Sequence, residues 1–201
     1  MSNYAEELTY WFYRLNGYFL INNFVIHNTP ENRLTSGSDV DLLAIRFPFV
    51  SEPVGGQADD WHSSVTEFTA NNSISAVIVE VKSGSYQADN LFLMEDIRYV
   101  LPRFGCFSEI LEEHLNNIHA NPDFLMEAEN VRVSKVLVAE SVVQNDRFHS
   151  ISLEEIRLFI SERMAKYSTP KNQSRLFFPS DLLQHLINEE HRRIEGQNQQ
   201  D

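Results

Sequence analysis

Three charged side chains stand at the ends of two apolar stretches that have the pattern of β-strands. Asp41 lies near the start of the first stretch, and Glu80 and Lys82 lie at the end of the second. Strand side chains alternate between faces, so Glu80 and Lys82 point the same way, as do Asp39 and Asp41. Two carboxylates and an amine on adjacent strands can hold a divalent cation and activate a water. The alternative is a salt bridge between strand-end charges, but charges on a buried face are costly without partners, which favours a site.

The elements that must position these residues follow from hydrophobic periodicity and turn residues. We expect strands at 19–27, 39–47, 74–82 and 131–139, and helices at 4–16, 90–101, 108–119, 153–167 and 181–194. Capping residues open several of the helices, namely Asn3 with Glu6, Ser108, Ser152 with Glu155, and Ser180. Pro102 is expected to break a helix, and 169–174 to be a linker. Three consecutive strands between helices predict an α/β sandwich around a mixed sheet.

The chain divides in this interpretation into a core at 1–167 and a C-terminal helical extension and tail at 168–201. Within the core, 48–73 reads as a long insertion between two strands, rich in residues that break regular structure. Loops of that length are often functional, so we expect a substrate lid or a partner-docking loop there.

Composition limits the classes of function. The 201 residues carry a formal net charge of -13, which repels phosphate backbones and argues against a general DNA-coating protein. Cys106 is the one cysteine, so neither a disulfide framework nor a multi-cysteine zinc site is possible within the chain. No apolar run approaches a membrane span, and the start of the chain lacks the basic residues of a signal peptide. We therefore expect a cytoplasmic protein that does not bind a membrane.

The segments around the three charged residues resemble a known family. They read Ser38-Asp39-Val40-Asp41-Leu42-Leu43-Ala44 and Val79-Glu80-Val81-Lys82-Ser83-Gly84, and Gly17-Tyr18 precedes them after a helix. This pattern resembles the PD-(D/E)XK nuclease superfamily, in particular its Holliday-junction-resolvase-like branch. Ser38 and Asp39 depart from the family, which has Gly and Glu at these positions. The resemblance implies a restriction-endonuclease-like three-layer α/β sandwich with an αβββαβ core, here followed by C-terminal helices.

The resemblance also implies a role for each residue. Asp41, Glu80 and the backbone carbonyl of Val81 would bind Mg²⁺ or Mn²⁺, and Lys82 would orient the attacking water or neutralise the transition state. Glu7 resembles the family's helix-borne glutamate, an auxiliary ligand or a structural brace. Its spacing on the first helix independently places it near the edge of the core.

Other candidates have ordinary explanations that stay open. Asp39 could assist the metal or face solvent, and Gln87 could contact substrate or belong to a polar loop. Asp59, Asp60 and His62 read as an acidic loop rather than a ligand cluster, and a phosphate-binding patch is a further possibility for Arg98, Arg103, Arg132 and Lys135.

The sequence therefore predicts a metal-dependent endonuclease that hydrolyses phosphodiester bonds in DNA rather than RNA. The net charge of -13 suggests a local basic patch or a basic protein partner. A homodimer is expected from the resemblance alone. Two alternatives remain, a non-catalytic interaction subunit on the same fold and an acidic inhibitor that mimics DNA.

Overall fold

A computed structural model describes residues 3–26, 39–68 and 72–198 of the chain. Its helices are α1 (Tyr4–Leu15), α2 (Ser63–Phe68), α3 (Met94–Phe104), α4 (Glu112–Ala120), α5 (Leu153–Lys166), α6 (Ser168–Ser174) and α7 (Asp181–Gln197). Its strands are β1 (Phe19–Val25), β2 (Asp39–Arg46), β3 (Ile74–Lys82), β4 (Asp123–Met126), β5 (Val131–Ala139) and β6 (His149–Ser152). Short 3₁₀ helices occupy Ala58–Asp60, Ala88–Asn90 and Arg175–Phe177.

The strands form one mixed sheet in the order β1-β2-β3-β5-β4, with β6 also paired to β5. The pairs β1–β2 and β2–β3 are antiparallel, whereas β5 runs parallel to β3. Strand β4 pairs with residues 131–134 of β5, and β6 pairs with residues 136–139. The two short strands therefore divide one edge of the sheet between them.

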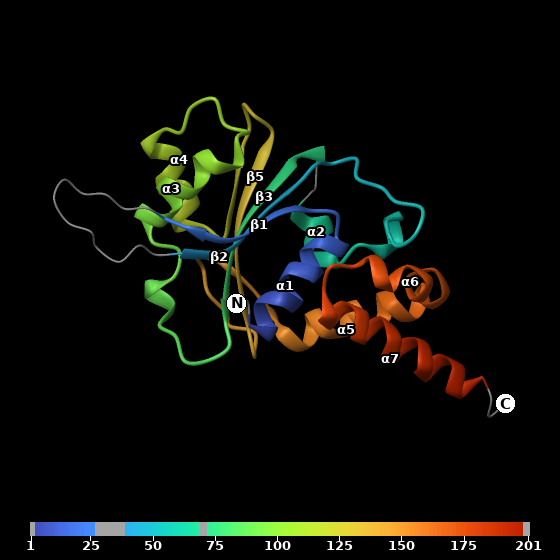
Figure 1. Cartoon of the computed structure of the whole chain (residues 1–201). Helices are drawn as coiled ribbons and strands as arrows, with labels where there is room; N and C mark the ends of the chain where they lie inside the picture. Colours follow the sequence, from blue (N-terminus) through green and yellow to red (C-terminus); the bar gives the residue numbers. More distant parts are fainter. Residues whose placement is uncertain (1–2, 27–38, 69–71, 199–201) are drawn as a thin grey trace.

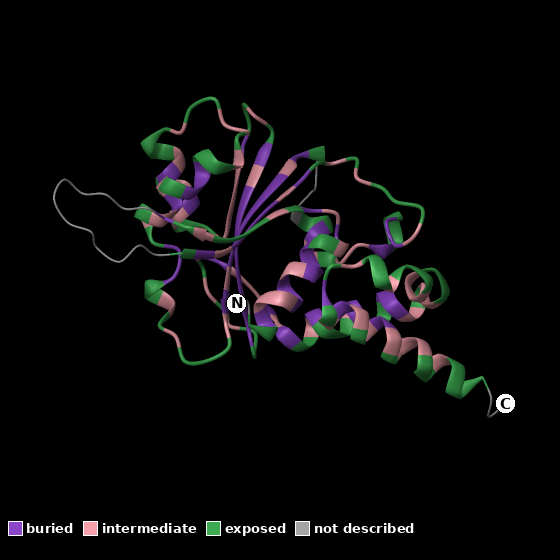
Figure 2. Cartoon of the chain, viewed as in Figure 1, coloured by how far each residue is buried: buried purple, intermediate pink, exposed green. Residues whose placement is uncertain are grey.

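Helices cover both faces of the sheet, with α3 and α4 on one side and α1, α5, α6 and α7 on the other (Figure 1). Alternation along β3 supplies both cores: Val77 and Val79 pack towards α1 and α5, and Ala76 and Ile78 pack towards α3 and α4. The central strands are accordingly buried along most of their length (Figure 2). The predicted α/β class with a mixed sheet between helical layers is confirmed.

Local sequence signals explain the helix ends. Asn3 caps α1 in a reciprocal capping box with Glu6, and the hydroxyls of Ser152 and Ser180 cap α5 and α7. After α1 the chain turns at Gly17, whose φ is +81°. A Cβ there would stand 2.6 Å from a side-chain carbon of Val50, so only glycine fits both the conformation and the space.

Three local expectations are wrong. Pro102 does not break its helix, because it lies in the last turn of α3, which continues to Phe104 and ends at Gly105. Ser108 does not cap α4, which begins at Glu112; the Ser108 hydroxyl instead donates to Glu129. Residues 169–174 are not a linker, since they lie within the helix α6. The expected end of the first strand, at His27, lies outside the described residues.

The first half of the 48–73 segment is hydrogen-bonded to helix α5. The guanidinium of Arg163 on α5 donates to the backbone carbonyls of Gly55 and Asp60, and also to Leu15 at the end of α1. Gly55 has a φ of +77°, and a Cβ on it would stand 3.1 Å from Arg163. The described part of this segment therefore packs on α5 through one buried arginine.

Among residues 3–26, 39–68 and 72–198, no helix is both long enough and apolar enough to cross a bilayer.

Candidate metal and catalytic site

Asp41 lies where β2 parts from β3 and where the ladder between β2 and β1 skips one pair. The last pair between β2 and β3 joins Leu42 to Val79, and the ladder between β1 and β2 omits the pair of Asp41 with Asn23. Asn23 has a positive φ of 51°, which places a local distortion directly across from Asp41. The Asp41 carboxylate accepts a 2.6 Å hydrogen bond from the Val81 amide. A side chain thus holds the end of β3 where the backbone pairing stops.

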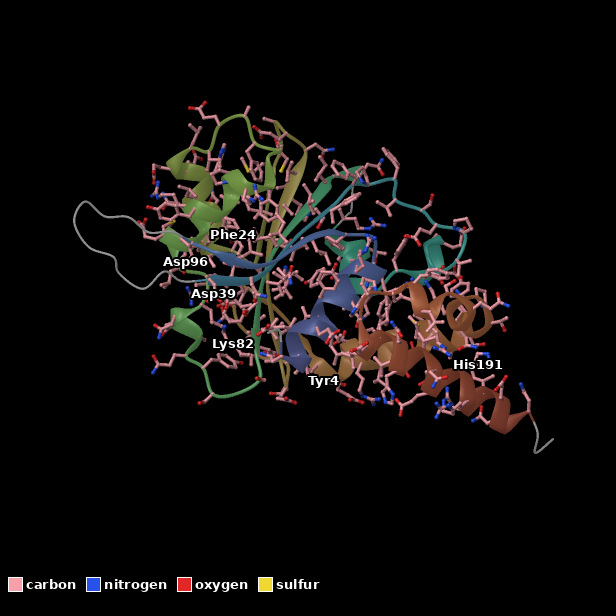
Figure 3. The ribbon with its side chains drawn as sticks, in the orientation of Figure 1. Tyr4, Phe24, Asp39, Lys82, Asp96 and His191 are labelled. Carbon is pink, nitrogen blue, oxygen red and sulfur yellow. The ribbon has the colours of Figure 1, made fainter. Side chains whose placement is uncertain are left out.

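Glu80 and Lys82 lie at that end of β3 and share a face of the strand. The ammonium of Lys82 stands 2.6 Å from Glu80 Oε2 and 3.5 Å from Asp41 Oδ2. The Glu80 and Asp41 side chains are 12% and 14% exposed. Two largely buried carboxylates therefore converge on one cation. Lys82 at the end of β3 and Asp39 at the start of β2 are labelled in Figure 3.

The electrostatics of this cluster are those of a crowded acidic site. Burial raises the pKa of Glu80 to about 7; the Lys82 ammonium opposes this rise, and the charges of Asp41 and Asp39 add to it. Burial would lower the pKa of Lys82, but its hydrogen bond to Glu80 and the two nearby negative charges outweigh it and raise this pKa. Lys82 therefore stays charged at neutral pH and partly compensates two carboxylates.

The donor set fits a hard divalent cation. Asp41 and Glu80 already direct oxygens at a single positive charge, and Mg²⁺ is commonly bound by one or two carboxylates with waters completing its shell. Across the described part of the chain there is no group of three His, Cys, Asp or Glu side chains able to hold a metal. The remaining ligands would therefore be waters, a backbone carbonyl such as that of Val81, or substrate oxygens.

Glu7 lies near Asp41 but has its own partner. Glu7 and Asp41 line the same pocket, of about 280 Å³, together with Trp11 and Ser180. The Ser180 hydroxyl, which caps α7, donates to Glu7 at 2.5 Å. Glu7 thus joins α1 to the start of α7 beside Asp41. We call this cavity the Asp41 pocket.

The two weaker candidates lie in exposed positions. Asp39 is the exposed first residue of β2, and its backbone pairs with Val25. Gln87 is exposed in the loop after β3, and its side-chain oxygen accepts a 3.0 Å hydrogen bond from Asn90. Asp39 contributes to the charge around Glu80, whereas the side-chain hydrogen bond of Gln87 is made within its own loop.

The acidic loop at 59–62 has a structural role. The Asp60 carboxylate is buried and bound by Lys166 and by the hydroxyl of Tyr167, at 2.8 to 3.0 Å. Asp59 also contacts Lys166, and the ring of His62 pairs with Glu155 at 3.2 Å. The interpretation as a loop rather than a ligand cluster agrees with these contacts.

Three of the four residues of the suggested basic patch are paired or enclosed, whereas the fourth, Arg103, is exposed and lies over the ring of Phe24. Arg98 is paired with Glu112, Arg132 with Asp123, and Lys135 is buried with its ammonium donating to the His119 carbonyl. These cations are neutralised or enclosed, so they offer no shared phosphate-binding surface.

The sequence reading also missed a pair of residues beside the Asp41 pocket, Arg14 and Lys171. A signal for Arg14 was present, because it follows Glu7 by seven residues and therefore lies on the same face of α1. No local signal links Lys171 to it, since 157 positions separate the two and only the fold brings them to the lining of one cavity.

Comparisons with protein-family models, with curated proteins and with solved structures gave no match to this chain.

Proposed function

We propose that the protein is a metal-dependent nuclease of the restriction-endonuclease-like class that hydrolyses phosphodiester bonds in DNA. The observation that carries the proposal is the convergence of Asp41 and Glu80 on Lys82 where β2 separates from β3. The order of helix, three antiparallel strands, helices and a strand parallel to the third supports the assignment of class.

Each residue has a role in this proposal that its position supports. Asp41 and Glu80 would hold Mg²⁺ or Mn²⁺, which would supply Lewis acidity and a water of lowered pKa. The Lys82 ammonium is within 3.5 Å of both carboxylates, so it can hold a water against the phosphorus and offset negative charge in the transition state. Glu7 and Ser180 would fix the wall of the site on the α1 side.

The test combines metal binding with cleavage. Purified protein is titrated with Mn²⁺ by calorimetry and incubated with single-stranded, duplex and branched DNA and with RNA. We expect Asp41→Asn and Glu80→Gln to weaken Mn²⁺ binding and to slow cleavage by about a hundredfold or more. The control Glu127→Gln removes the same charge from an exposed position outside the site and should leave both unchanged.

The outcomes separate the alternatives. Absence of cleavage on every substrate, with or without Mn²⁺ binding, refutes the nuclease. Mn²⁺ binding through Asp41 and Glu80 without cleavage would instead favour a non-catalytic subunit on the same fold. Cleavage that survives Glu80→Gln would place the catalytic centre elsewhere.

A further inference from the structure

A second cavity adjoins the Asp41 pocket along α1. It has a volume of about 420 Å³, and Tyr10, Trp11 and Pro179 line both cavities. The walls of the second cavity also come from the loop after β2 and from the segment between α6 and α7. The two cavities thus lie next to each other along helix α1, and Asp41 lines the first of them; together we call them the α1 groove.

The far end of the α1 groove carries two cations, Arg14 and Lys171. Within the described residues no carboxylate forms a salt bridge with either, although Glu52 in the same lining attracts the Lys171 ammonium electrostatically. Several other cations of the described residues are neutralised in ion pairs, namely Lys82, Arg98, Arg132, Arg147, Arg157, Lys166 and Arg193. Glu52 is the carboxylate in this lining, and its side chain is solvent-exposed. On a chain with a net charge of -13, two cations in one cavity beside a single carboxylate give a locally positive region that can attract an anion.

Aromatic side chains lie beside these cations. Phe177 lines the groove and is 88% exposed, while Phe178 lies with its ring 5.7 Å from the Lys171 ammonium. Tyr10 packs edge-on against Trp11 in the wall shared by both cavities. Cations interleaved with accessible aromatic rings are the elements of a surface for unpaired nucleotides, because phosphates meet the cations and bases stack on the rings.

The spacing along α1 fits a short strand. Glu7, Tyr10, Trp11 and Arg14 recur at helical spacing on one face. At 1.5 Å per residue, the rise from Glu7 to Arg14 is about 10 Å, the length of roughly three stacked nucleotides at about 3.4 Å each. The cavity volume is that of a pocket for one small organic molecule, which suits a nucleotide or two and not a duplex.

We propose that the α1 groove binds an unpaired nucleic-acid strand that extends away from Asp41, with phosphates at Arg14 and Lys171 and a base on Phe177. This inference rests on the proposed nuclease function and narrows its substrate. The preferred substrates carry a single-stranded overhang, flap or gap at the cleavage position, and a blunt duplex is a poor one.

Binding without cleavage tests the groove. The full-length protein, in EDTA, is titrated into fluorescein-labelled DNA about 12 nucleotides long, single-stranded or as a blunt duplex, and anisotropy is recorded over a range of salt. We expect the single strand to bind at least about tenfold more tightly than the duplex. The double variant Arg14→Gln/Lys171→Gln should weaken single-strand binding by about tenfold or more and reduce the salt slope by about 1.4, which corresponds to two phosphate contacts.

The matched control is Arg157→Gln/Arg192→Gln, which removes two exposed charges outside the groove. It should leave the affinity and the salt slope unchanged, which separates a site from the loss of net charge. Phe177→Ala should weaken binding by about tenfold with no change in the salt slope, because it removes stacking and not a charge. Circular dichroism melting of each variant verifies the fold.

Each result bears on one of the two proposals. Equal affinity of the Arg14/Lys171 variant and the unaltered protein, or equal loss in the control, overturns the strand site and leaves the nuclease standing if cleavage persists. Loss of binding in that variant alone, with no cleavage of any substrate in Mg²⁺, supports the strand site and refutes the nuclease. Competition by inorganic phosphate as effective as by the oligonucleotide overturns the strand and identifies a small-anion site.

Discussion

Replacing Glu80 by glutamine removes a buried charge while keeping the shape of the side chain. Burial raises the pKa of Glu80 from 4.5 to about 7, with the attraction of Lys82 already included. A carboxyl with a higher pKa in the folded chain stabilises the fold below its unfolded pKa, and this contribution is lost as the pH rises through the folded value. At about 1.4 kcal/mol per pKa unit, the loss between pH 4.5 and pH 8 amounts to about 3 kcal/mol.

We therefore expect Glu80→Gln to have the stability of the unaltered protein near pH 4.5 and to be about 3 kcal/mol more stable at pH 8. Urea denaturation in EDTA at a series of pH values measures this difference, which corresponds to a shift of about 1 M or more in the midpoint. Glu127→Gln, at an exposed position, provides the control and should show no such dependence on pH.

A stability difference that does not grow between pH 4.5 and pH 8 would refute the reasoning, as would a variant less stable than the unaltered protein at pH 8. The first result would mean that Glu80 is not desolvated in the folded chain. The second would mean that its attraction to Lys82 outweighs burial. A variant that is more stable without the Glu80 carboxylate is the result expected for a residue that serves function and lowers stability.

Three further outcomes are expected. Arg163→Met should destabilise the fold by about 3 kcal/mol in chemical denaturation, because it leaves buried carbonyls unpaired, whereas exposed Arg157→Met should cost under about 1 kcal/mol. Burial lowers the pKa of Lys135 to about 7, so Lys135→Met should stabilise the protein by up to about 5 kcal/mol at pH 6 and lose this advantage as the pH approaches 10.5. A gain that stays constant with pH, measured by urea denaturation, would contradict the burial of the charge. Ser180→Ala removes both a helix cap and the Glu7 partner, so it should lower the stability by about 2 kcal/mol in thermal or urea denaturation, while Ser180→Asn should restore the cap alone.

The sequence predicted the strands with long apolar runs, because their signal is local. The strand at 131–139 was found in full, and the segments at 39–47 and 74–82 matched within a residue. Strands β4 and β6 were missed, since four residues give no clear alternation and both are defined by pairing with β5. The prediction that Pro102 breaks its helix was wrong, because a proline in the last turn of a helix does little to disrupt it. The signal for the end of this helix was Gly105.

The candidate site divides in the same way. Hydrophobic periodicity predicted that Asp41, Glu80 and Lys82 lie near the ends of adjacent strands. In the structure the carboxylates of Asp41 and Glu80 both lie within 3.5 Å of the Lys82 ammonium. The sequence pattern could not show that Ser180 donates a hydrogen bond to Glu7, because the two residues are 173 positions apart and meet only through helix packing. Contacts of that range depend on the whole fold rather than on any local pattern.

The two edges of the sheet differ in how open they are to another strand. One edge is divided between β4 and β6, four residues each, which leaves no long row of free backbone groups. The other is β1, seven residues without a charge or a proline, and it exposes Phe19, Ile21 and Val25. Among the described residues, the β1 edge therefore has only the distortion at Asn23 to hinder the addition of another strand. Association through β1 would end with two copies sharing a continuous sheet, because each copy has used its single open edge, and it would not propagate into a fibre.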